Sequence, residues 1–536
     1  MRSFSSGQYC TSKRVIRVDS TVPKPREITA EHQPRPAAPA MKQSQRIAKN
    51  MVAGALAVGF GGVLQLAAIV FIARSVGVTL FGTYSFILAF AMFFQLLADS
   101  GLSNILVREL ATKPERMKEI LGAALVLIWA LTFAIGGLLL AVLPFLHFTL
   151  EVKALMALMG AATLTQFHAT AYGAVLRSQE DNELHALGFL LHKVLFCICV
   201  FVGLRSGLGL TGVVLAHLIP NLFQRTLYKY LVIRCYIRPR LCFDYDQCKY
   251  LFTHSLPVGG ATMLRLLAQQ IDIVILTWLT DLQTVGLFSG PYRISLALRF
   301  IPQTMSVPLY PMYSRLAVRS EVKLQLQKAY ELSVKFFLVS GCAVATVFVA
   351  SAAPLMTLLL GSKYCAAAPA MQILGIAFVP FFVGNPLPLL LTALHQQRFL
   401  LWATITSSAL RIALNFALIP PLGFIGPSLA FLAGEIVILL FMTMRLRQSG
   451  YPLPLLKIAW RPLVASAGMA LVLVAGAKGS QIVFLGSALL AAAVYLGITL
   501  ALRTFSTQEL ELGREGVAFL KPLIARWSNQ PQEQRP

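Results

Sequence analysis

Charged residues are scarce in this chain. Only 13% of its 536 residues are charged, whereas about a quarter are charged in an average soluble protein. Hydrophobic residues make up 57%, and the mean hydropathy is +0.70. Apolar runs of about 20 residues recur, which is the length that crosses a hydrocarbon core of about 30 Å. The composition excludes a soluble globular domain and predicts a polytopic α-helical membrane protein.

Acidic residues are the rarer charge. The chain has 22 Asp and Glu against 46 Lys and Arg, which gives a formal net charge of +24. In a soluble protein such an excess suggests a nucleic-acid partner. Here the cations lie mostly in predicted loops, and no basic patch is interleaved with aromatic residues that could stack on bases. We therefore attribute the excess to membrane topology and expect no nucleic-acid partner.

Catalytic and metal-binding motifs are also missing. The sequence contains no Walker motif, no G-x-S-x-G and no H-E-x-x-H. Its eight cysteines do not have zinc-ligand spacing, and its histidines are expected to be hydrogen-bonded residues of a core or cavity. Every predicted outer loop is short, unlike the large outer loop typical of membrane glycan polymerases and ligases. We expect no enzyme activity, no metal site and no cofactor.

The apolar runs predict an all-α membrane protein with about fourteen transmembrane helices. Their estimated centres lie near residues 62, 92, 133, 165, 195, 220, 264, 297, 342, 380, 409, 434, 467 and 491. An even number of crossings places both termini on one side. With this assignment, the opposite loops hold only five cations: Arg74, Lys153, Arg205, Lys363 and Lys478. Because Lys and Arg accumulate in cytoplasmic loops, both termini are predicted to be cytoplasmic.

A short internal repeat predicts how the helices are grouped. Arg74–Phe90 parallels Leu279–Leu298, and each stretch has an F/V-G-x-Y/F-S motif that enters a long helix. A repeat that keeps the direction of the helices predicts two pseudo-symmetric six-helix bundles plus two C-terminal helices. The predicted segments are a disordered cytosolic tail (1–45), a first bundle (46–233), a cytosolic linker (234–249), a second bundle (250–448), two additional helices (449–505) and a cytosolic tail (506–536). The sequence leaves open whether translation starts at Met1 or Met41.

Charged residues inside the predicted helices are the candidate functional residues. Such charges are costly at membrane depth and normally face a protein interior or a water-filled cavity. Five cations are predicted to hold an anionic ligand such as a lipid diphosphate: Arg265, Arg293, Arg299, Arg411 and Lys193. Two acids, Asp272 and Glu435, are candidates for coupling to H⁺ or Na⁺. The alternative is that these residues form structural ion pairs, Asp272 with Arg265 and Glu435 with Arg411.

Two stretches carry a resemblance to a known family. They comprise Arg74, Gly77, Phe81, Gly82, Tyr84, Asp99, Gly101, Leu102 and Arg108–Ala111, and then Asp272, Val285, Gly286, Phe288, Ser289, Arg293, Ile301, Pro302 and Tyr310–Leu316. In this order they resemble the polysaccharide transporter family of O-antigen and exopolysaccharide flippases. That family is part of the superfamily that includes the MATE drug exporters.

The resemblance implies a function. It implies a flippase in the cell inner membrane that moves an undecaprenyl-diphosphate-linked oligosaccharide for surface polysaccharide or lipopolysaccharide biosynthesis. Lipid-linked oligosaccharide, membrane lipids and a polysaccharide polymerase are the implied partners. The alternatives are a cation-coupled MATE-like multidrug exporter and a non-transporting membrane scaffold. The sequence does not reveal which glycan is carried, the coupling ion or the oligomeric state.

Overall fold

The computed structural model describes residues 43–239, 243–306, 309–317, 323–477 and 479–505. Side chains of residues 43–53, 55, 56 and 256–265 are outside this description. The predicted tails therefore lie outside it, apart from the start of the first helix, and so does the side chain of Arg265. Residues from Ile47 onward form one unit, to which the following description applies.

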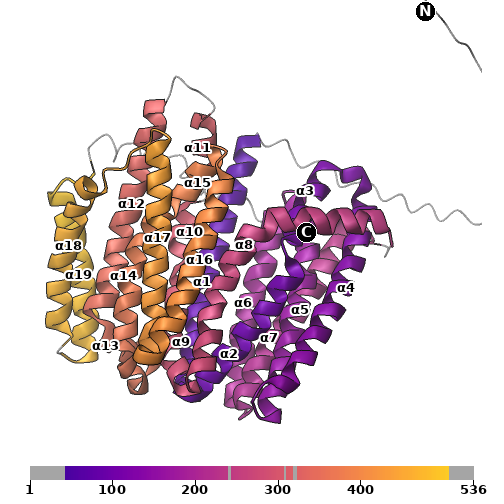
Figure 1. The fold of residues 1–536 in the computed structure, drawn as a ribbon, viewed down its shortest axis with the longest axis horizontal. Helices are drawn as coiled ribbons and strands as arrows, with labels where there is room; N and C mark the ends of the chain where they lie inside the picture. Colours follow the sequence, from indigo (N-terminus) through magenta and orange to yellow (C-terminus); the bar gives the residue numbers. More distant parts are fainter. Residues whose placement is uncertain (1–42, 240–242, 307–308, 318–322, 478, 506–536) are drawn as a thin grey trace, which may run out of the picture. The chain divides into compact units, whose positions relative to one another are not determined.

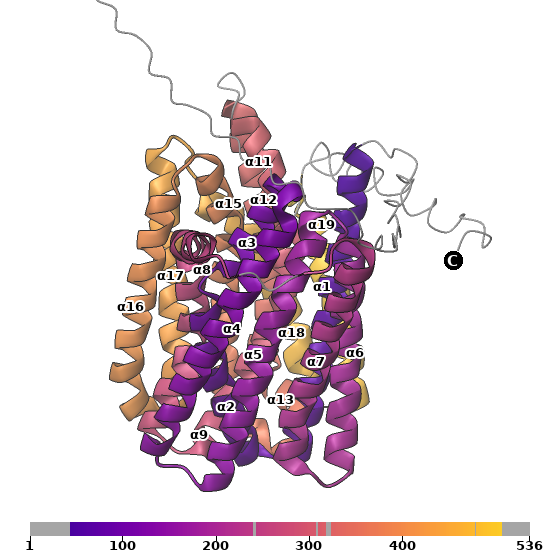
Figure 2. The same ribbon diagram turned by 90° about the vertical axis from the view of Figure 1, so that its right-hand side faces the viewer.

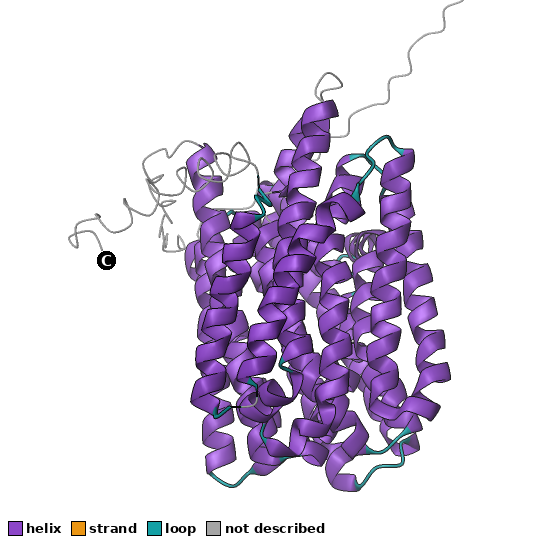
Figure 3. Ribbon diagram, turned by 90° about the vertical axis from the view of Figure 1, so that its left-hand side faces the viewer, coloured by secondary structure: helices purple, strands orange, loops and turns teal. Residues whose placement is uncertain are grey.

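Every regular element in the described residues is a helix (Figures 1 and 3). The α-helices are α1 Gln43–Val76, α2 Val78–Asp99, α3 Leu102–Thr112, α4 Met117–Val142, α5 Leu150–Ser178, α6 Asn182–Arg205, α7 Gly209–Cys235, α8 Tyr245–Leu279, α9 Leu282–Leu298, α10 Phe300–Ser306, α11 Leu309–Ala317, α12 Lys323–Ala350, α13 Ala352–Leu360, α14 Ala368–Gly384, α15 Pro386–Ala393, α16 Gln397–Leu422, α17 Gly426–Gln448, α18 Leu455–Gly476 and α19 Gln481–Ala501. The prediction of an all-helical protein is confirmed, and each predicted centre lies in one of these helices.

Nine stretches of the described residues are long and apolar enough to cross a membrane. One of them joins α16 and α17 into a run of 52 residues. Helices α5, α7, α8 and α9 are not among the nine, although α5, α7 and α8 are long enough to span a bilayer. The chain is thus a multi-span helical membrane protein.

The long helices run between two ends of the bundle. We call these ends the Gly77 end, where α1 turns into α2, and the Lys113 end, where α3 finishes. The first part of α8 crosses the bundle at the Lys113 end before the helix descends (Figures 1 and 2). There the Tyr250 hydroxyl donates to the Glu109 carboxylate at 3.0 Å. The predicted linker 234–249 thus contains the end of α7 and the first turn of α8.

The turn between α8 and α9 is short, as predicted. Asp281 begins α9, and its carboxylate accepts a hydrogen bond from the Thr284 amide at 2.6 Å. This bond satisfies one of the free amide groups at the helix start. It also holds the pKa of Asp281 below its usual range, because it stabilises the carboxylate form.

Two of the helices with a predicted centre are broken into shorter helices. The helix predicted around residue 297 ends as α9 at Leu298 and resumes as α10 after Arg299. The helix predicted around residue 380 ends as α14 and resumes as α15 after Asn385, where Pro386 begins the new helix. Proline has no amide hydrogen for the preceding turn, and this explains the second break.

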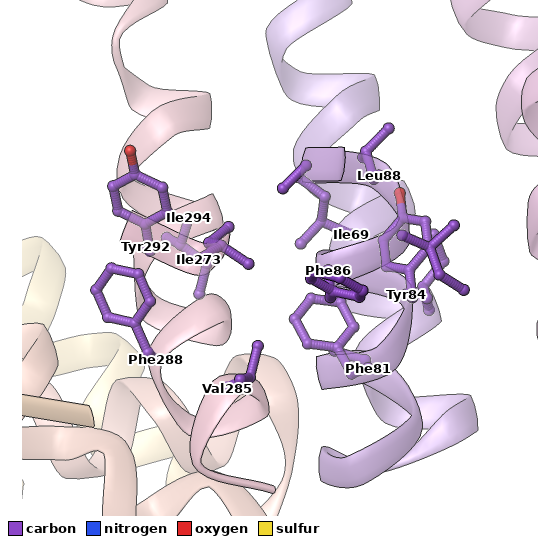
Figure 4. Packing of buried hydrophobic residues seen from close by; sticks show 14 of the residues in the cluster. Ile69, Phe81, Tyr84, Phe86, Leu88, Ile273, Val285, Phe288, Tyr292 and Ile294 are labelled. Carbon is purple, nitrogen blue, oxygen red and sulfur yellow. The ribbon is translucent and has the colours of Figure 1, made fainter. Parts of the chain in front are cut away.

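Helices α2 and α9 cross at the Gly77 end, and we call this contact the α2–α9 seam. A Cβ at Gly82 would lie 2.0 Å from the Leu282 carbonyl oxygen, and a Cβ at Gly286 would lie 2.1 Å from the Val78 carbonyl oxygen. Only glycine allows backbones to approach so closely. The two glycines hold the same position in the F/V-G-x-Y/F-S motifs. The two copies of the predicted repeat therefore contact each other here. Figure 4 shows buried side chains of the two helices beside the seam.

We predict that Gly82→Ala and Gly286→Ala each destabilise the protein by about 3 kcal/mol, because the added methyl group forces the α2 and α9 backbones apart. The measurement is the melting temperature of detergent-purified protein. Gly137→Ala in α4 is the control, since a Cβ there meets nothing within 4 Å. Equal melting temperatures for the Gly82, Gly286 and Gly137 variants would contradict the close contact.

Candidate binding cavity

A cavity of about 720 Å³ lies among helices from both halves of the chain. It is bordered by α1, α6, α8, α9, α10 and α14 to α17. On α6, α16 and α17, the lining residues lie mostly in the half of the helix that is nearer the Lys113 end. The polar lining residues are Gln65, Lys193, Gln269, Arg299, Gln303, Ser306, Asn385, Thr404, Ser407, Ser408, Arg411 and Glu435.

The cavity brings together several of the predicted site residues. Lys193, Arg299, Arg411 and Glu435 border it, although α6, the α9–α10 break, α16 and α17 carry them. Both helix breaks contribute a residue, Arg299 and Asn385. Irregular backbone at membrane depth is tolerated where protein buries it or a cavity adjoins it. The broken helices thus shape the cavity wall.

Arg411 and Asp272 form a buried ion pair behind the cavity wall. Asp272 is completely buried, and Arg411 is 6% exposed. The Arg411 Nε donates to Asp272 at 2.9 Å, and an Nη of Arg411 binds the second carboxylate oxygen. Asn415 donates to the same carboxylate at 2.8 Å. The alternative of a structural ion pair is thus realised for Asp272, but with Arg411 as its partner.

Lys193 and Arg299 each contact neutral groups at the cavity. The Lys193 ammonium group donates to the Gln65 side chain on α1 at 2.8 Å. The Arg299 guanidinium lies over two rings, 4.7 Å from the centroid of Phe381 and 5.4 Å from that of Phe431. These contacts help to hold the two cations at the cavity.

Arg293 lies away from the cavity lining, at the α2–α9 seam. It is 8% exposed and donates to the Ser85 hydroxyl at 2.9 Å and to the Ser85 carbonyl at 3.2 Å. Its guanidinium lies 5.2 Å from the ring centroid of Tyr84. Arg293 therefore joins α9 to α2. Its predicted contact with a ligand stays a prediction, as does that of Arg265.

The buried histidines hold helices of the first half together. His217 on α7 bonds the Tyr84 hydroxyl at 3.0 Å, and His192 on α6 bonds the Asn221 side chain at 2.8 Å. His168 bonds the Thr132 hydroxyl at 3.0 Å. These bonds confirm the prediction of hydrogen-bonded core histidines for His168, His192 and His217. Buried polar groups need such partners because their desolvation is otherwise uncompensated.

The structure adds site residues that the sequence did not reveal. Phe381 and Phe431 contact the guanidinium groups, and Gln65 holds Lys193. Phenylalanine is an ordinary residue of a membrane helix, so hydropathy gives no signal for these two rings. Gln65 interrupts the apolar run of α1, and this interruption was the one signal available.

Comparisons with known proteins identify the family. The family model described as polysaccharide biosynthesis protein matches residues 47–317, which is half of the chain. The chain belongs to this polysaccharide biosynthesis protein family, so the resemblance seen in the sequence is confirmed. It is a membrane transporter and not an enzyme. A search of curated proteins gave no match.

Solved structures show the same fold. The lipid II flippase MurJ, in an inward closed conformation, is 14% identical with a TM-score of 0.70, covering 84% of this chain and 99% of its own. A MOP superfamily transporter from Pyrococcus furiosus is 16% identical with a TM-score of 0.56, covering 76% and 99%. A multidrug resistance MATE family transporter in an outward-facing conformation is 17% identical with a TM-score of 0.55, covering 77% and 99%. The chain thus has the fold of the MOP superfamily.

We predict that Asp272→Asn destabilises the protein by about 3–5 kcal/mol, because it leaves the Arg411 charge buried without its anion. The double variant Asp272→Asn with Arg411→Met removes that charge and recovers most of the loss. Melting temperatures of the purified single and double variants measure both effects. Additive losses would show that the two side chains do not stabilise each other.

Proposed function

We propose that this transporter is a flippase for a lipid-linked oligosaccharide, carried on undecaprenyl diphosphate from the inner to the outer leaflet. The observation that supports this most is the gathering of Lys193, Arg299 and Arg411 from separate helices around one cavity. Arginine and lysine bind phosphate oxygens strongly. The hydroxyl and amide side chains of the lining offer hydrogen bonds to sugar hydroxyls. Lipopolysaccharide O-antigen and exopolysaccharide are the product classes we propose.

We propose fourteen transmembrane helices for the chain. This number counts α16 and α17 separately and adds α5, α7, α8 and α9 to the nine apolar stretches. It gives two six-helix bundles, at 46–233 and 250–448, and two additional helices at 449–505. The scarcity of cations in the loops at the Gly77 end supports cytoplasmic termini in a cell inner membrane. The Gly77 end then faces outward, and the cavity lies toward the cytoplasm.

In the proposed cycle the two bundles rock around the cavity. The α2–α9 seam closes the outer end and has to separate before a ligand leaves on that side. Arg293 joins the seam through Ser85, and Arg74 on α1 donates to the Leu359 carbonyl of α13 at 2.7 Å. Each of these bonds joins an arginine to a neutral acceptor. Breaking them therefore costs less free energy than breaking a buried ion pair.

An ion gradient is the proposed driving force. Glu435 borders the cavity and is the candidate for H⁺ or Na⁺ coupling that the geometry favours. Asp272 is held by Arg411 and Asn415, which supports the role of counter-ion. Arg265 and Arg293 stay in the proposed set of phosphate ligands.

The proposed function predicts ion-gradient-dependent crossing of a fluorescent undecaprenyl-diphosphate oligosaccharide in liposomes that contain the purified protein. Arg299→Ala and Lys193→Ala should each slow the crossing at least about tenfold, since each removes a phosphate contact worth about 1.4 kcal/mol or more. Lys153→Ala, in the α4–α5 region of the Gly77 end, is the control. Gradient-driven export of an organic cation, without crossing of the lipid, would favour the drug-exporter alternative.

The proposed orientation predicts that Cys365 reacts from outside the cell. It lies in the short helix Ser362–Ala367 and is exposed, whereas the other cysteines of the described residues are buried or partly buried. A membrane-impermeant maleimide applied to intact cells should label the protein, and Cys365→Ser should remove the label. Labelling only after the cytoplasmic face is made accessible would reverse the orientation.

A further inference from the structure

Arg225 on α7 is an intramembrane cation that the cavity does not use. It is partly buried, and its guanidinium carbon lies 5.4 Å from the ring centroid of Trp129 on α4. Helix α5 lies between α4 and α7 and packs against both (Figure 2). The lining of the cavity includes no residue of these three helices. A ligand of Arg225 is therefore not the ligand of the cavity.

The ring beside Arg225 lies at the lipid-facing surface of the bundle. Helix α4 belongs to one of the nine apolar stretches, and only 17% of its most apolar segment is buried inside the protein. Trp129 is partly buried. Phe133 stacks on it with 5.5 Å between the ring centroids and is 71% exposed. An apolar side chain this exposed on a membrane span faces lipid.

Trp129 is held in place from its inner side. Its ring centroid lies 4.4 Å from that of His168 on α5, and His168 is buried. The Nε2 of His168 is bonded to the Thr132 hydroxyl at 3.0 Å. The indole ring thus packs against a fixed group and gives the cation a fixed surface. Attraction between a cation and an aromatic ring then holds the Arg225 guanidinium at this position.

The N–H groups of Arg225 lack an acceptor. Arg225 forms no hydrogen bond and no ion pair with any residue that the structure describes, and the indole N–H of Trp129 has no acceptor among these residues either. Arg225 lies about 15 Å from the end of α7 at Cys235, at about 1.5 Å per residue. Hydrocarbon offers no acceptor, so an unpaired charge is costly at this depth. The acceptor has to come from outside the described part of the chain.

The residues around Arg225 follow the order of the parts of a phospholipid. Lys229, one turn nearer the Lys113 end, is exposed, and the next residue, Tyr230, is 54% exposed. Lysine and tyrosine are typical of the membrane interface, where lipid phosphates lie. In the other direction, Phe133 lies one turn deeper than Trp129, at the level of acyl chains. A lipid whose phosphate contacts Arg225 and Lys229 would lay its chains over the two rings.

We propose that Phe133, Trp129, Arg225 and Lys229 form a binding site for an anionic phospholipid, with Arg225 as the main ligand of its phosphate. Arginine forms parallel, charge-assisted hydrogen bonds to phosphate oxygens, and basic pockets between transmembrane helices bind anionic head groups. Water accepts hydrogen bonds but brings no charge to offset the guanidinium. A zwitterionic phospholipid carries a cation of its own beside the phosphate, and that cation is repelled by Arg225 and Lys229.

The test is native mass spectrometry of the delipidated full-length protein in detergent, with phosphatidylglycerol and with phosphatidylcholine of the same acyl chains. We expect the first phosphatidylglycerol to bind at least about tenfold more tightly than phosphatidylcholine. Arg225→Gln should weaken this first binding about tenfold, because it removes charge-assisted hydrogen bonds to the phosphate. If Arg225→Gln does not purify as a single species, Trp129→Leu replaces it, since it removes the ring that holds the guanidinium.

Arg234→Gln is the matched control. Arg234 is exposed on the same helix, and at about 100° per residue it lies on the face opposite Arg225. Its guanidinium donates to the Tyr230 hydroxyl at 3.0 Å. The control removes the same charge away from the Trp129 ring and should change the first affinity by less than about twofold. Glycerol phosphate has the phosphate without the chains and should not compete at equal concentration.

Four results overturn the inference: an unchanged first affinity in Arg225→Gln or its replacement, the same loss in Arg234→Gln, equal wild-type affinities for the two lipids, or competition by glycerol phosphate. The last result would assign the site to a free phosphate compound. None of the four bears on the movement of lipid-linked oligosaccharide, because α4, α5 and α7 do not line the cavity. The inference and the proposed function can therefore fail separately.

Discussion

The ion pair of Arg411 and Asp272 is the interaction on which the cavity wall depends. Both charges are almost completely removed from water, where an unpaired charge costs several kcal/mol. The pair joins α16 to α8, and Asn415 and Tyr292 complete the hydrogen bonds around it. Without its carboxylate partner, Arg411 could not stay at this depth. The pair therefore stabilises the Arg411 cation beside the cavity.

The other intramembrane cations are held in a different way. Lys193 bonds a glutamine, Arg293 bonds a serine, and Arg299 lies over aromatic rings. Contacts of this kind with neutral groups reduce the cost of desolvating a cation. The ion pair of Arg411 and these contacts with neutral groups thus hold the cations inside the helix bundle.

The seam at the Gly77 end has the opposite character to the cavity. There two backbones meet at Gly82 and Gly286, and no space is left for a side chain. Contacts of this kind depend on shape and dispersion rather than on charge. Closure at one end and a charged cavity toward the other end are what a transporter with alternating access needs. The equivalent glycines of the two motifs form the closure together, so both halves of the chain contribute to it.

Much of this protein was determined by the sequence alone, because its causes act along the chain. Apolar runs of bilayer length specified the helices, and the F-G-x-Y-S and V-G-x-F-S motifs marked the segments that form the seam. The cost of charge in a membrane singled out Lys193, Arg299, Arg411 and Glu435 as residues beside a cavity. For these features the periodicity and the residue type were sufficient.

Only the tertiary structure decided which residues meet. Asp272 lies 139 positions from Arg411, and no periodicity relates α8 to α16. Arg293 and Arg299 were both predicted to bind the ligand, yet Arg293 packs against Ser85 because α9 faces α2 at that turn. Phe431 resembles every other phenylalanine of an apolar helix until two arginines are found beside its ring. Helix packing sets these contacts, and packing depends on the shapes of surfaces that are far apart in the chain.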